Sequence, residues 1–519
     1  MDLVCNTRRI SDLPENRLST MNLFALLYER FEEALDCPAL VLSGAAKGAR
    51  EPAWTYRDLD RASARFAATL RLRGVEPGDR VLVQVPKSVE AVALYLGVLR
   101  CGGVYVPLNT AYTEREVAFF VSDASPGVVV RDATGVGEGD SGAAPRTVDI
   151  DALWRESRSF EPDPAIERRA DDDLAAICYT SGTTGRSKGA MITHRNLTSN
   201  ALALHEIWGF EPGDVLLHAL PIFHVHGLFV ALHTAFLNAS KVLFLPQFDA
   251  ADVRRLLPEA TVLMGVPTFY SRLLAEPGFR AADCEGFRLF VSGSAPLTEA
   301  VFGDFQARTG HRILERYGMT EAGMITSNPL CGDRVAGTVG FSLPDVEVRV
   351  VGEDGAELPA GEVGTLEIRG PNLFAGYWGL PDKTAEEMRG DGFFVTGDLA
   401  SLDGEGRVTL VGRGKDLIIA GGFNVYPKEV EDRLDEVAGV AESAVIGAPH
   451  ADLGEGVVAV LVADEAPVED DTLRAALDAG LARYKQPRRF YWVGELPRNA
   501  MGKVQKNVLR ERYRDAYDG

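Results

Sequence analysis

The chain has 519 residues and a formal net charge of −21 at pH 7; 46% of its residues are hydrophobic and 25% are charged. This composition is that of a globular protein too long for one ordinary core, so we expect two or more domains. The negative charge argues against nucleic acid or an anionic membrane surface as a partner. No apolar run approaches the ~20 residues that span a bilayer, so we expect no membrane insertion.

The cysteines and the N-terminus indicate a cytoplasmic protein. The six cysteines are scattered, with no C-x-x-C pair and no metal-like spacing, which favours reduced thiols. Residues 1–20 mix acidic and basic side chains and lack an apolar core, so they fit neither a signal peptide nor a transit peptide. We expect them to form a disordered extension.

The first part of the chain alternates strand-like and helix-like segments. Residues 22–35 and 88–100 have helical patterns, while the patterns of 80–85 and 102–108 predict strands. Such alternation predicts an α/β fold, in which parallel-rich sheets are flanked by helices.

The sequence TSGTTGRSKG, residues 180–189, follows an apolar strand-like run at 174–178. Its glycines allow a tight turn and a close approach of backbone to ligand. Its hydroxyls, together with Arg186 and Lys188, suit a phosphate held between a strand and the helix expected near His194. The alternative is a solvated surface turn. The Walker pattern G-x-x-x-x-G-K-[ST] is not present.

Further strands are expected at 242–245, 262–266 and 288–292, the last leading into Gly293, Ser294 and Ala295. Ligands of open α/β sheets lie beyond the carboxyl ends of the strands, so these loops should converge. His224 and His226 stand two residues apart after an apolar run. They could suggest a metal, but no further ligands are evident nearby.

The last third of the chain is richer in strand patterns. Strands and turns at 346–351, 364–369 and 393–398 predict a β-rich subdomain, followed by GRGKD at 412–416. Glycines around charged residues suit a hinge. We therefore place a domain boundary there, between an N-terminal domain of 21–413 and a small, mobile α+β lid of 414–519.

Several motifs together resemble the adenylate-forming superfamily, which contains acyl-CoA synthetases, luciferases and peptide-synthetase adenylation domains. They are TSGTTGRSKG, ERYGMTE at 315–321, TGD at 396–398, GRGK at 412–415 and PRNAMGK at 497–503, in the order of that superfamily. The resemblance implies an acid–thiol ligase that forms an acyl adenylate from ATP and then a CoA thioester. It also implies Mg²⁺ as cofactor and a monomer or weak homo-oligomer.

The resemblance also assigns roles to individual residues. Lys503, Glu321, Thr320 and Lys188 would be catalytic, Glu321 and Thr184 would hold the metal, and Lys415 would be the hinge. Gly421 and Gly422 would line the CoA tunnel, and His224, His226, Ser292 and Met324 the acid site. ATP or AMP would be bound by Thr180, Ser181, Gly182, Thr183, Thr184, Gly185, Lys188, Gly293, Ser294, Ala295, Glu315, Arg316, Tyr317, Gly318, Thr320, Asp398, Arg413 and Lys503.

The strings HALPIFHVHGLF, LMGVPTFY and RLFVSGSAPL look like the malonyl-CoA synthetase branch of that superfamily. Arg288 lies in an apolar strand on the same face as Ser292. A buried arginine needs an anion, either the second carboxylate of malonate or methylmalonate or a protein carboxylate in a salt bridge. Ala322 and Gly323 replace the polar pair expected after ERYGMTE, which bears on the fit around the substrate.

Other functions remain open at the sequence level. A synthetase for a different short- or medium-chain acid would share every motif and need no role for Arg288. A peptide-synthetase adenylation domain would need a following carrier domain. A non-enzymatic adenylate-binding protein would not require Glu321 or Lys503.

Overall fold

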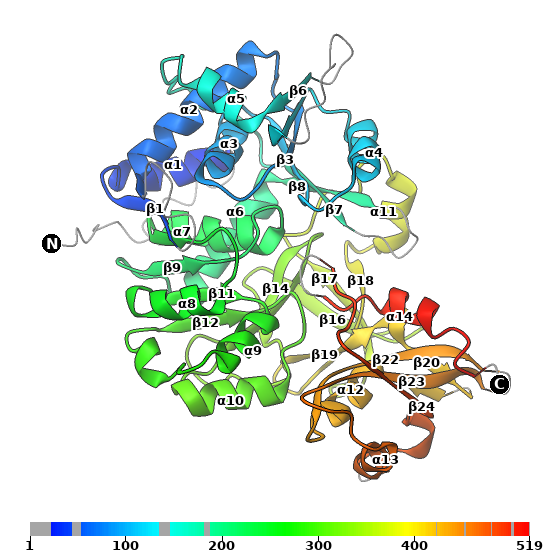
Figure 1. The fold of residues 1–519 in the computed structure, drawn as a ribbon. Coiled ribbons are helices and arrows are strands. Elements are labelled where there is room, and N and C mark those ends of the chain that lie inside the picture. The colour runs from blue at the N-terminus through cyan, green and yellow to red at the C-terminus, as the bar shows by residue number, and fades with distance from the viewer. Residues whose placement is uncertain are drawn as a thin grey trace.

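The computed structural model of the chain is shown in Figure 1. The predicted extension at 1–20, most of the 180–189 loop and Gly422 lie outside the described residues. The structure describes residues 22–43, 53–133, 146–180, 187–421, 423–450, 453–478, 480–499 and 503–517.

The first sheet has six strands in the order β6-β5-β3-β4-β7-β8. All neighbouring pairs are parallel except β7 with β8. Helix α3 is buried at every residue except Glu90, because most of its residues are apolar. The bounds are β3 (Arg80–Gln84), β4 (Val104–Pro107), β5 (Val128–Arg131), β6 (Arg146–Asp149), β7 (Leu174–Thr180), β8 (Lys188–Thr193), α2 (Tyr56–Leu72), α3 (Val89–Arg100), α4 (Glu114–Ala124) and α5 (Ile150–Ser157).

The second sheet has nine strands in the order β15-β14-β13-β12-β11-β9-β10-β1-β2. Its six central strands run parallel, and antiparallel strands close both edges. The strands are β1 (Pro38–Leu42), β2 (Ala53–Thr55), β9 (Val215–His218), β10 (Lys241–Phe244), β11 (Val262–Gly265), β12 (Leu289–Ser292), β13 (Leu314–Met319), β14 (Gly323–Ser327) and β15 (Phe341–Ser342). The helices of this part are α1 (Leu23–Glu33), α6 (His194–Ile207), α7 (His233–Leu237), α8 (Ala250–Leu256), α9 (Pro267–Ala275) and α10 (Glu299–Thr309).

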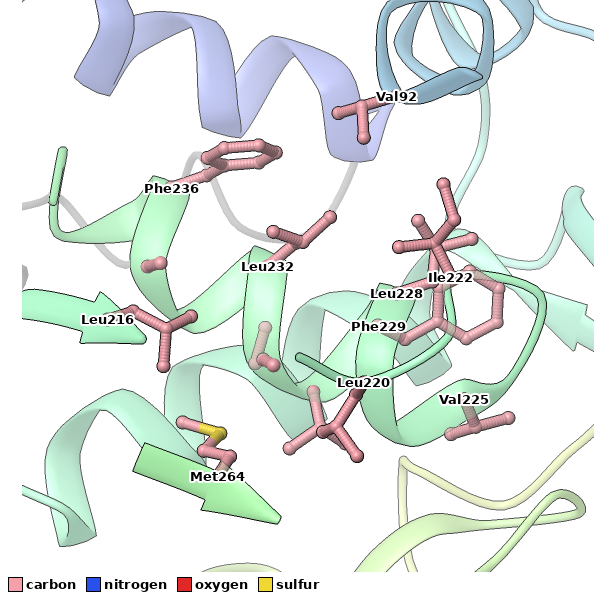
Figure 2. Close-up of a cluster of buried hydrophobic side chains, with 14 of the residues drawn as sticks. Val92, Leu216, Leu220, Ile222, Val225, Leu228, Phe229, Leu232, Phe236 and Met264 are labelled. Carbon is pink, nitrogen blue, oxygen red and sulfur yellow. The ribbon is translucent and has the colours of Figure 1, made fainter. Parts of the chain in front are cut away.

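A wide-turned π-helical segment, η5 (His226–Leu232), continues directly into α7. Figure 2 shows Leu228, Phe229 and Leu232 of this segment in an apolar cluster with Val92 of α3 and Met264 of β11. The packing fixes where the segment starts, and therefore where His226 lies. A π-helical turn inside a helix frequently marks a functional site.

A four-stranded antiparallel sheet follows, in the order β16-β17-β18-β19. It is the predicted β-rich subdomain, and one short helix precedes its third strand. The bounds are β16 (Glu347–Val351), β17 (Gly364–Arg369), α11 (Pro381–Glu387), β18 (Phe394–Leu402) and β19 (Val408–Arg413).

The C-terminal part has its own sheet and its own apolar cores (Figure 1). The N-terminal core extends to Val408 and the next begins at Ile418, so the two cores lie on either side of the turn η8 (Gly414–Asp416). The bounds are β20 (Ile418–Ala420), β21 (Phe423–Val425), α12 (Pro427–Asp435), β22 (Val440–His450), β23 (Gly454–Ala463), α13 (Asp470–Asp478), β24 (Arg489–Val493) and α14 (Lys506–Arg512).

The predicted α/β fold class is confirmed, and two local expectations are wrong. The 180–189 loop joins the antiparallel strands β7 and β8, with Thr180 opposite Lys188, and not a strand to a helix. The prediction missed β8 because its alternation is interrupted by Gly189 and Ala190. Reduced thiols were expected; Cys37 is disulfide-bonded, whereas Cys101, Cys178, Cys284 and Cys331 are free. Among the described residues, no helix has the length and apolarity that a membrane crossing requires.

Candidate active site

The carboxyl end of β12 lies beside the first residues of β13, with Ser292 opposite Glu315. Gly293, Ser294 and Ala295 leave the sheet at this edge, and Ser294 has a left-handed backbone with φ of +71°. Such strain in a non-glycine residue is typical of functional loops. A Cβ atom on Gly293 would lie 2.4 Å from Cζ of Arg316, so a larger residue there would require the guanidinium to move.

Three of the predicted nucleotide-binding residues are brought together by β13, β18 and β19. The Tyr317 hydroxyl donates to Oδ2 of Asp398. Nε of Arg413 lies 2.8 Å from Oδ1 of the same carboxylate. Asp398 and Arg413 face each other across the β18–β19 pair. A carboxylate fixed in this way can accept hydrogen bonds from two ribose hydroxyls.

The two histidines lie at the start of η5, close to the β12 edge. Oγ of Ser294 is 3.3 Å from Nδ1 of His226, and the His226 backbone N–H donates to Nδ1 of His224 over 3.2 Å. Burial and then the charge of Arg316 lower both pKa values, that of His224 to about 4, so both rings are neutral at pH 7. No group of three His, Cys, Asp or Glu side chains suited to a metal occurs in the described part of the chain.

Arg316 is a cation buried at the centre of this site. Arg316 is 3% exposed, and its Nε and Nη2 atoms have no hydrogen-bond partner among the described residues. Burial lowers the pKa of Arg316 to about 9, so it stays charged at neutral pH. A buried charge of this kind is stabilised only when an anion joins it. The family resemblance implied that Arg316 binds the nucleotide, but it did not indicate that its charge is buried and unpaired.

Glu321 and Lys188 contact two residues that the sequence did not indicate, Tyr377 and Glu387. The Tyr377 hydroxyl lies 3.0 Å from Oε1 of Glu321 and 2.7 Å from Oε2 of Glu387. Nζ of Lys188 lies 3.2 Å from Oε1 of Glu387 and 3.9 Å from the centre of the Tyr377 ring. Glu387 is the last residue of α11 and follows Glu386. Two adjacent glutamates at a helix end predict a solvent-exposed end, so the sequence did not indicate a site residue here.

The turn between β13 and β14 carries Thr320 and Glu321 and is held by two asparagines. The Asn200 side chain bonds both the N–H and the C=O of Met324, over 3.0 and 2.8 Å. Asn372 donates to the carbonyls of Ala322 and Met324. Met324 is buried. No local sequence pattern predicts this clamp, because its members lie far apart along the chain.

Lys503 comes from the C-terminal part and reaches this edge of the N-terminal part. Its positive charge lowers the pKa of His224. The pKa of Lys503 is itself lowered, first by desolvation and then by the charge of Arg413. Lys415 and Asp398 also lie within electrostatic range. The loop of Lys503 is closed by its backbone N–H, which donates to Oδ1 of Asn499 over 3.0 Å.

The structure contradicts the assignment of Arg288 to the substrate. Arg288 immediately precedes β12, so it lies at the opposite end of that strand from the site. Its Nε donates to Oδ1 of Asp214 over 2.7 Å, its Nη2 pairs with the other carboxylate oxygen, and its Nη1 donates to the Trp208 carbonyl. Arg288 therefore forms an internal salt bridge, which was the alternative to binding a substrate carboxylate.

Other predicted site residues are partly placed. Thr180 and Lys188 flank the phosphate loop, and Gly318 packs so tightly against the Gly323 carbonyl that a Cβ would not fit. Gly421 has φ of +60° and donates its N–H to the Leu453 carbonyl. Outside the described residues lie Ser181, Gly182, Thr183, Thr184, Gly185 and Gly422.

Comparison with known families gives two matches that together span most of the chain. Residues 29–378 match a family described as AMP-binding enzyme, and residues 429–503 match its C-terminal domain. The chain belongs to the AMP-binding enzyme family. The predicted resemblance to adenylate-forming enzymes is thereby confirmed, and the protein is an AMP-forming acyl-CoA synthetase.

Individual relatives carry several substrate names. A malonate–CoA ligase of Arabidopsis thaliana is 37% identical over 478 residues, covering 84% of this chain and 78% of the relative. A feruloyl-CoA synthase of Amycolatopsis is 35% identical over 466 residues, covering 89% and 94%. The crystal structure of ATP-bound MatB from Rhodopseudomonas palustris is 50% identical, with a TM-score of 0.91 and coverage of 96% and 99%.

Proposed function

We propose that this enzyme is a malonyl-CoA synthetase, which converts malonate, ATP and CoA to malonyl-CoA, AMP and diphosphate, and that it also accepts methylmalonate. The observation that carries the proposal is the buried guanidinium of Arg316, which lacks a protein anion among the described residues and lies beside Gly293, His224 and His226. A dicarboxylic acid can place one carboxylate on this cation while the other one reacts. The malonate–CoA ligase among the relatives supports the same choice.

Adenylation requires the free carboxylate to attack the α-phosphorus of ATP, with diphosphate as the leaving group. Negative charge builds up on the phosphoryl oxygens, so positioned cations should supply most of the catalysis. We assign Lys188 to the departing diphosphate and Lys503 to the carboxylate and α-phosphate. Asp398 and Arg413 hold the ribose, and Tyr317 stacks on the adenine.

Mg²⁺ fits the residues around Glu321. The Glu321 carboxylate is buried, and burial raises its pKa, which a divalent cation would reverse. Mg²⁺ commonly takes one or two carboxylates and completes its shell with substrate phosphates and water. Glu321, with Thr184 of the phosphate loop, would hold the ion, which would neutralise charge on the phosphates.

The second half-reaction needs the CoA thiol to attack the acyl carbonyl and release AMP. Lys503 would then stand close to the incoming thiol. We propose that the C-terminal part turns about Lys415, withdraws Lys503 and brings Gly421 and Gly422 to the thiol path. A cytoplasmic location and a monomeric or weakly oligomeric state remain predictions.

Substitution of Arg316 tests the choice of acid. Arg316→Met keeps an unbranched side chain and removes the guanidinium and its charge, so the distal carboxylate of malonate loses its partner. Truncating a buried charge pair costs about 2–5 kcal/mol, which corresponds to at least ~30-fold in kcat/KM. The measurement is kcat/KM for malonate, methylmalonate and propionate, with propionate expected to hold or rise because it has no second carboxylate.

The matched control is Arg288→Met, at the other end of β12. It breaks the pair with Asp214, so it should lower the unfolding temperature without changing the ranking of the three acids. A parallel loss of activity toward all three acids in Arg316→Met would remove the basis for a dicarboxylate substrate.

A further inference from the structure

The Tyr377 hydroxyl stands between two carboxylates that come from different parts of the chain. Glu321 follows β13 and Glu387 ends α11, and the hydroxyl is within hydrogen-bond distance of both, at 3.0 and 2.7 Å. A phenol carries one proton, so it can donate to only one of the two carboxylates at a time. An ordinary phenol has a pKa of about 10, so that proton is retained at neutral pH.

The surroundings of Glu387 favour it as the acceptor of that proton. Its contact with Tyr377 is the shorter one, and its other oxygen faces two cations, Lys188 at 3.2 Å and Lys383 at 3.1 Å. When Tyr377 donates to Glu387, its hydroxyl does not donate to Oε1 of Glu321. That oxygen is then available to a cation.

We propose that Glu387 is a positioning residue for magnesium–ATP, because it holds the Tyr377 hydroxyl away from Glu321 and fixes Lys188 beside the phosphate site. The inference rests on the proposed function, which assigns Glu321 to the metal and Lys188 to the diphosphate. Glu387 itself touches neither substrate nor metal in this scheme. It acts through the direction of one hydroxyl and the place of one ammonium group.

Glu387→Gln makes the scheme testable. The amide keeps the shape of the side chain but accepts a hydrogen bond less strongly than a carboxylate, so the phenolic proton turns to Glu321. Mg²⁺ must then compete with that hydrogen bond. The Mg²⁺ concentration at half-maximal ATP binding should rise about fivefold, since charge-assisted hydrogen bonds are roughly twice as strong as neutral ones. The measurement is calorimetric titration of the full chain with ATP at several Mg²⁺ concentrations and without any acid.

A second variant separates this effect from simple damage to the fold. Tyr377→Phe, added to Glu387→Gln, removes the competing hydroxyl and should return the Mg²⁺ midpoint to within about twofold of the wild type. Formation of thioester from supplied acyl adenylate and CoA should be unchanged in both variants, because that half-reaction has no triphosphate. The control is Glu386→Gln on the same helix, whose carboxylate is 66% exposed and pairs with Lys383. It should leave the midpoint unchanged.

Two results would overturn the proposal. One is a wild-type Mg²⁺ midpoint in Glu387→Gln; the other is a raised midpoint that Tyr377→Phe fails to correct, which would indicate a general structural role. Because binding is measured without acid, rejection of malonate by the enzyme would refute the proposed substrate and leave this test intact.

Discussion

Glu315 shows how strongly one buried carboxyl can depend on its surroundings. Glu315 is buried beside the end of β12, and its Oε1 has no hydrogen-bond partner in the described part of the chain. Burial raises the pKa of Glu315 from 4.5 to about 8, although the backbone N–H groups of Gly337 and Leu297 and the charge of Lys428 favour the ionised form. At neutral pH this carboxyl is therefore mostly protonated.

Glu315 should make the protein less stable as the pH rises. Between pH 4.5 and 8 the folded state retains a proton that the unfolded state has lost, so this group lowers the free energy of unfolding as the pH rises through that window. The slope is about 1.4 kcal/mol per pH unit. Glu315→Gln should remove this part of the slope, measured by denaturant unfolding at pH 5.5 and 7.5. Glu353→Gln, at an exposed position, should keep it; equal slopes in the two variants would refute the shift.

Arg288 and Arg316 show what a sequence cannot decide at the residue scale. Both are arginines next to or within apolar strands, and the sequence favoured Arg288 as the substrate ligand. The structure favours Arg316 instead, because Asp214 neutralises Arg288 and no described carboxylate is paired with Arg316. Asp214 is 74 residues away from Arg288, so no local pattern predicts the pair.

At the scale of elements, the turn from β13 to β14 positions Thr320 and Glu321. Gly323 begins β14 with φ of +58°, and a Cβ there would lie 2.7 Å from Oδ1 of Asn200. The same oxygen accepts the Met324 N–H. Glycine at 323 therefore allows both the left-handed backbone and the asparagine clamp, which explains its presence where a polar residue was expected.

Gly323→Ala should cost both stability and adenylation. A left-handed alanine costs about 1–2 kcal/mol, and the contact with Asn200 adds to that. A shift of the turn by about 1 Å would displace Glu321 and lower ATP–diphosphate exchange at least ~tenfold. The control is Gly355→Ala, with φ of +79° and no atom within 4 Å of an added Cβ, which should lose stability alone. Unaltered exchange in Gly323→Ala would show that the turn does not position Glu321.

At the scale of the whole molecule, two separately packed parts meet at one site. Asp398 and Arg413 belong to the antiparallel sheet, His224 precedes η5, and Lys503 is contributed by the C-terminal part. The apolar cores on the two sides of Gly414–Asp416 are distinct. The C-terminal part can therefore change its orientation without opening either core, as the proposed turn about Lys415 requires.

Lys503→Ala should separate the two half-reactions. Removing one positioned cation from a charged transition state typically costs ~10²–10³-fold in rate, so acid-dependent ATP–diphosphate exchange should fall by that factor. Conversion of supplied acyl adenylate and CoA to thioester should persist, because the proposed rotation withdraws Lys503 in that step. An equal loss in both half-reactions would contradict the rotation.

The sequence by itself determined the fold class, the order of the motifs and the chemistry of adenylation, because each of these depends on short contiguous patterns. The strand at 174–178 and the α+β part that follows Gly412 are predicted by local periodicity and glycine content. The chemistry of adenylation is implied by the resemblance of TSGTTGRSKG, ERYGMTE and PRNAMGK to the adenylate-forming superfamily. Only the tertiary structure decided which arginine is free, that Tyr377 joins Glu321 to Glu387, and that Asn200 and Asn372 clamp the catalytic turn. These arrangements depend on hydrogen bonds and ion pairs between residues brought together by sheet order and packing, and such partners leave no periodic signal along the chain.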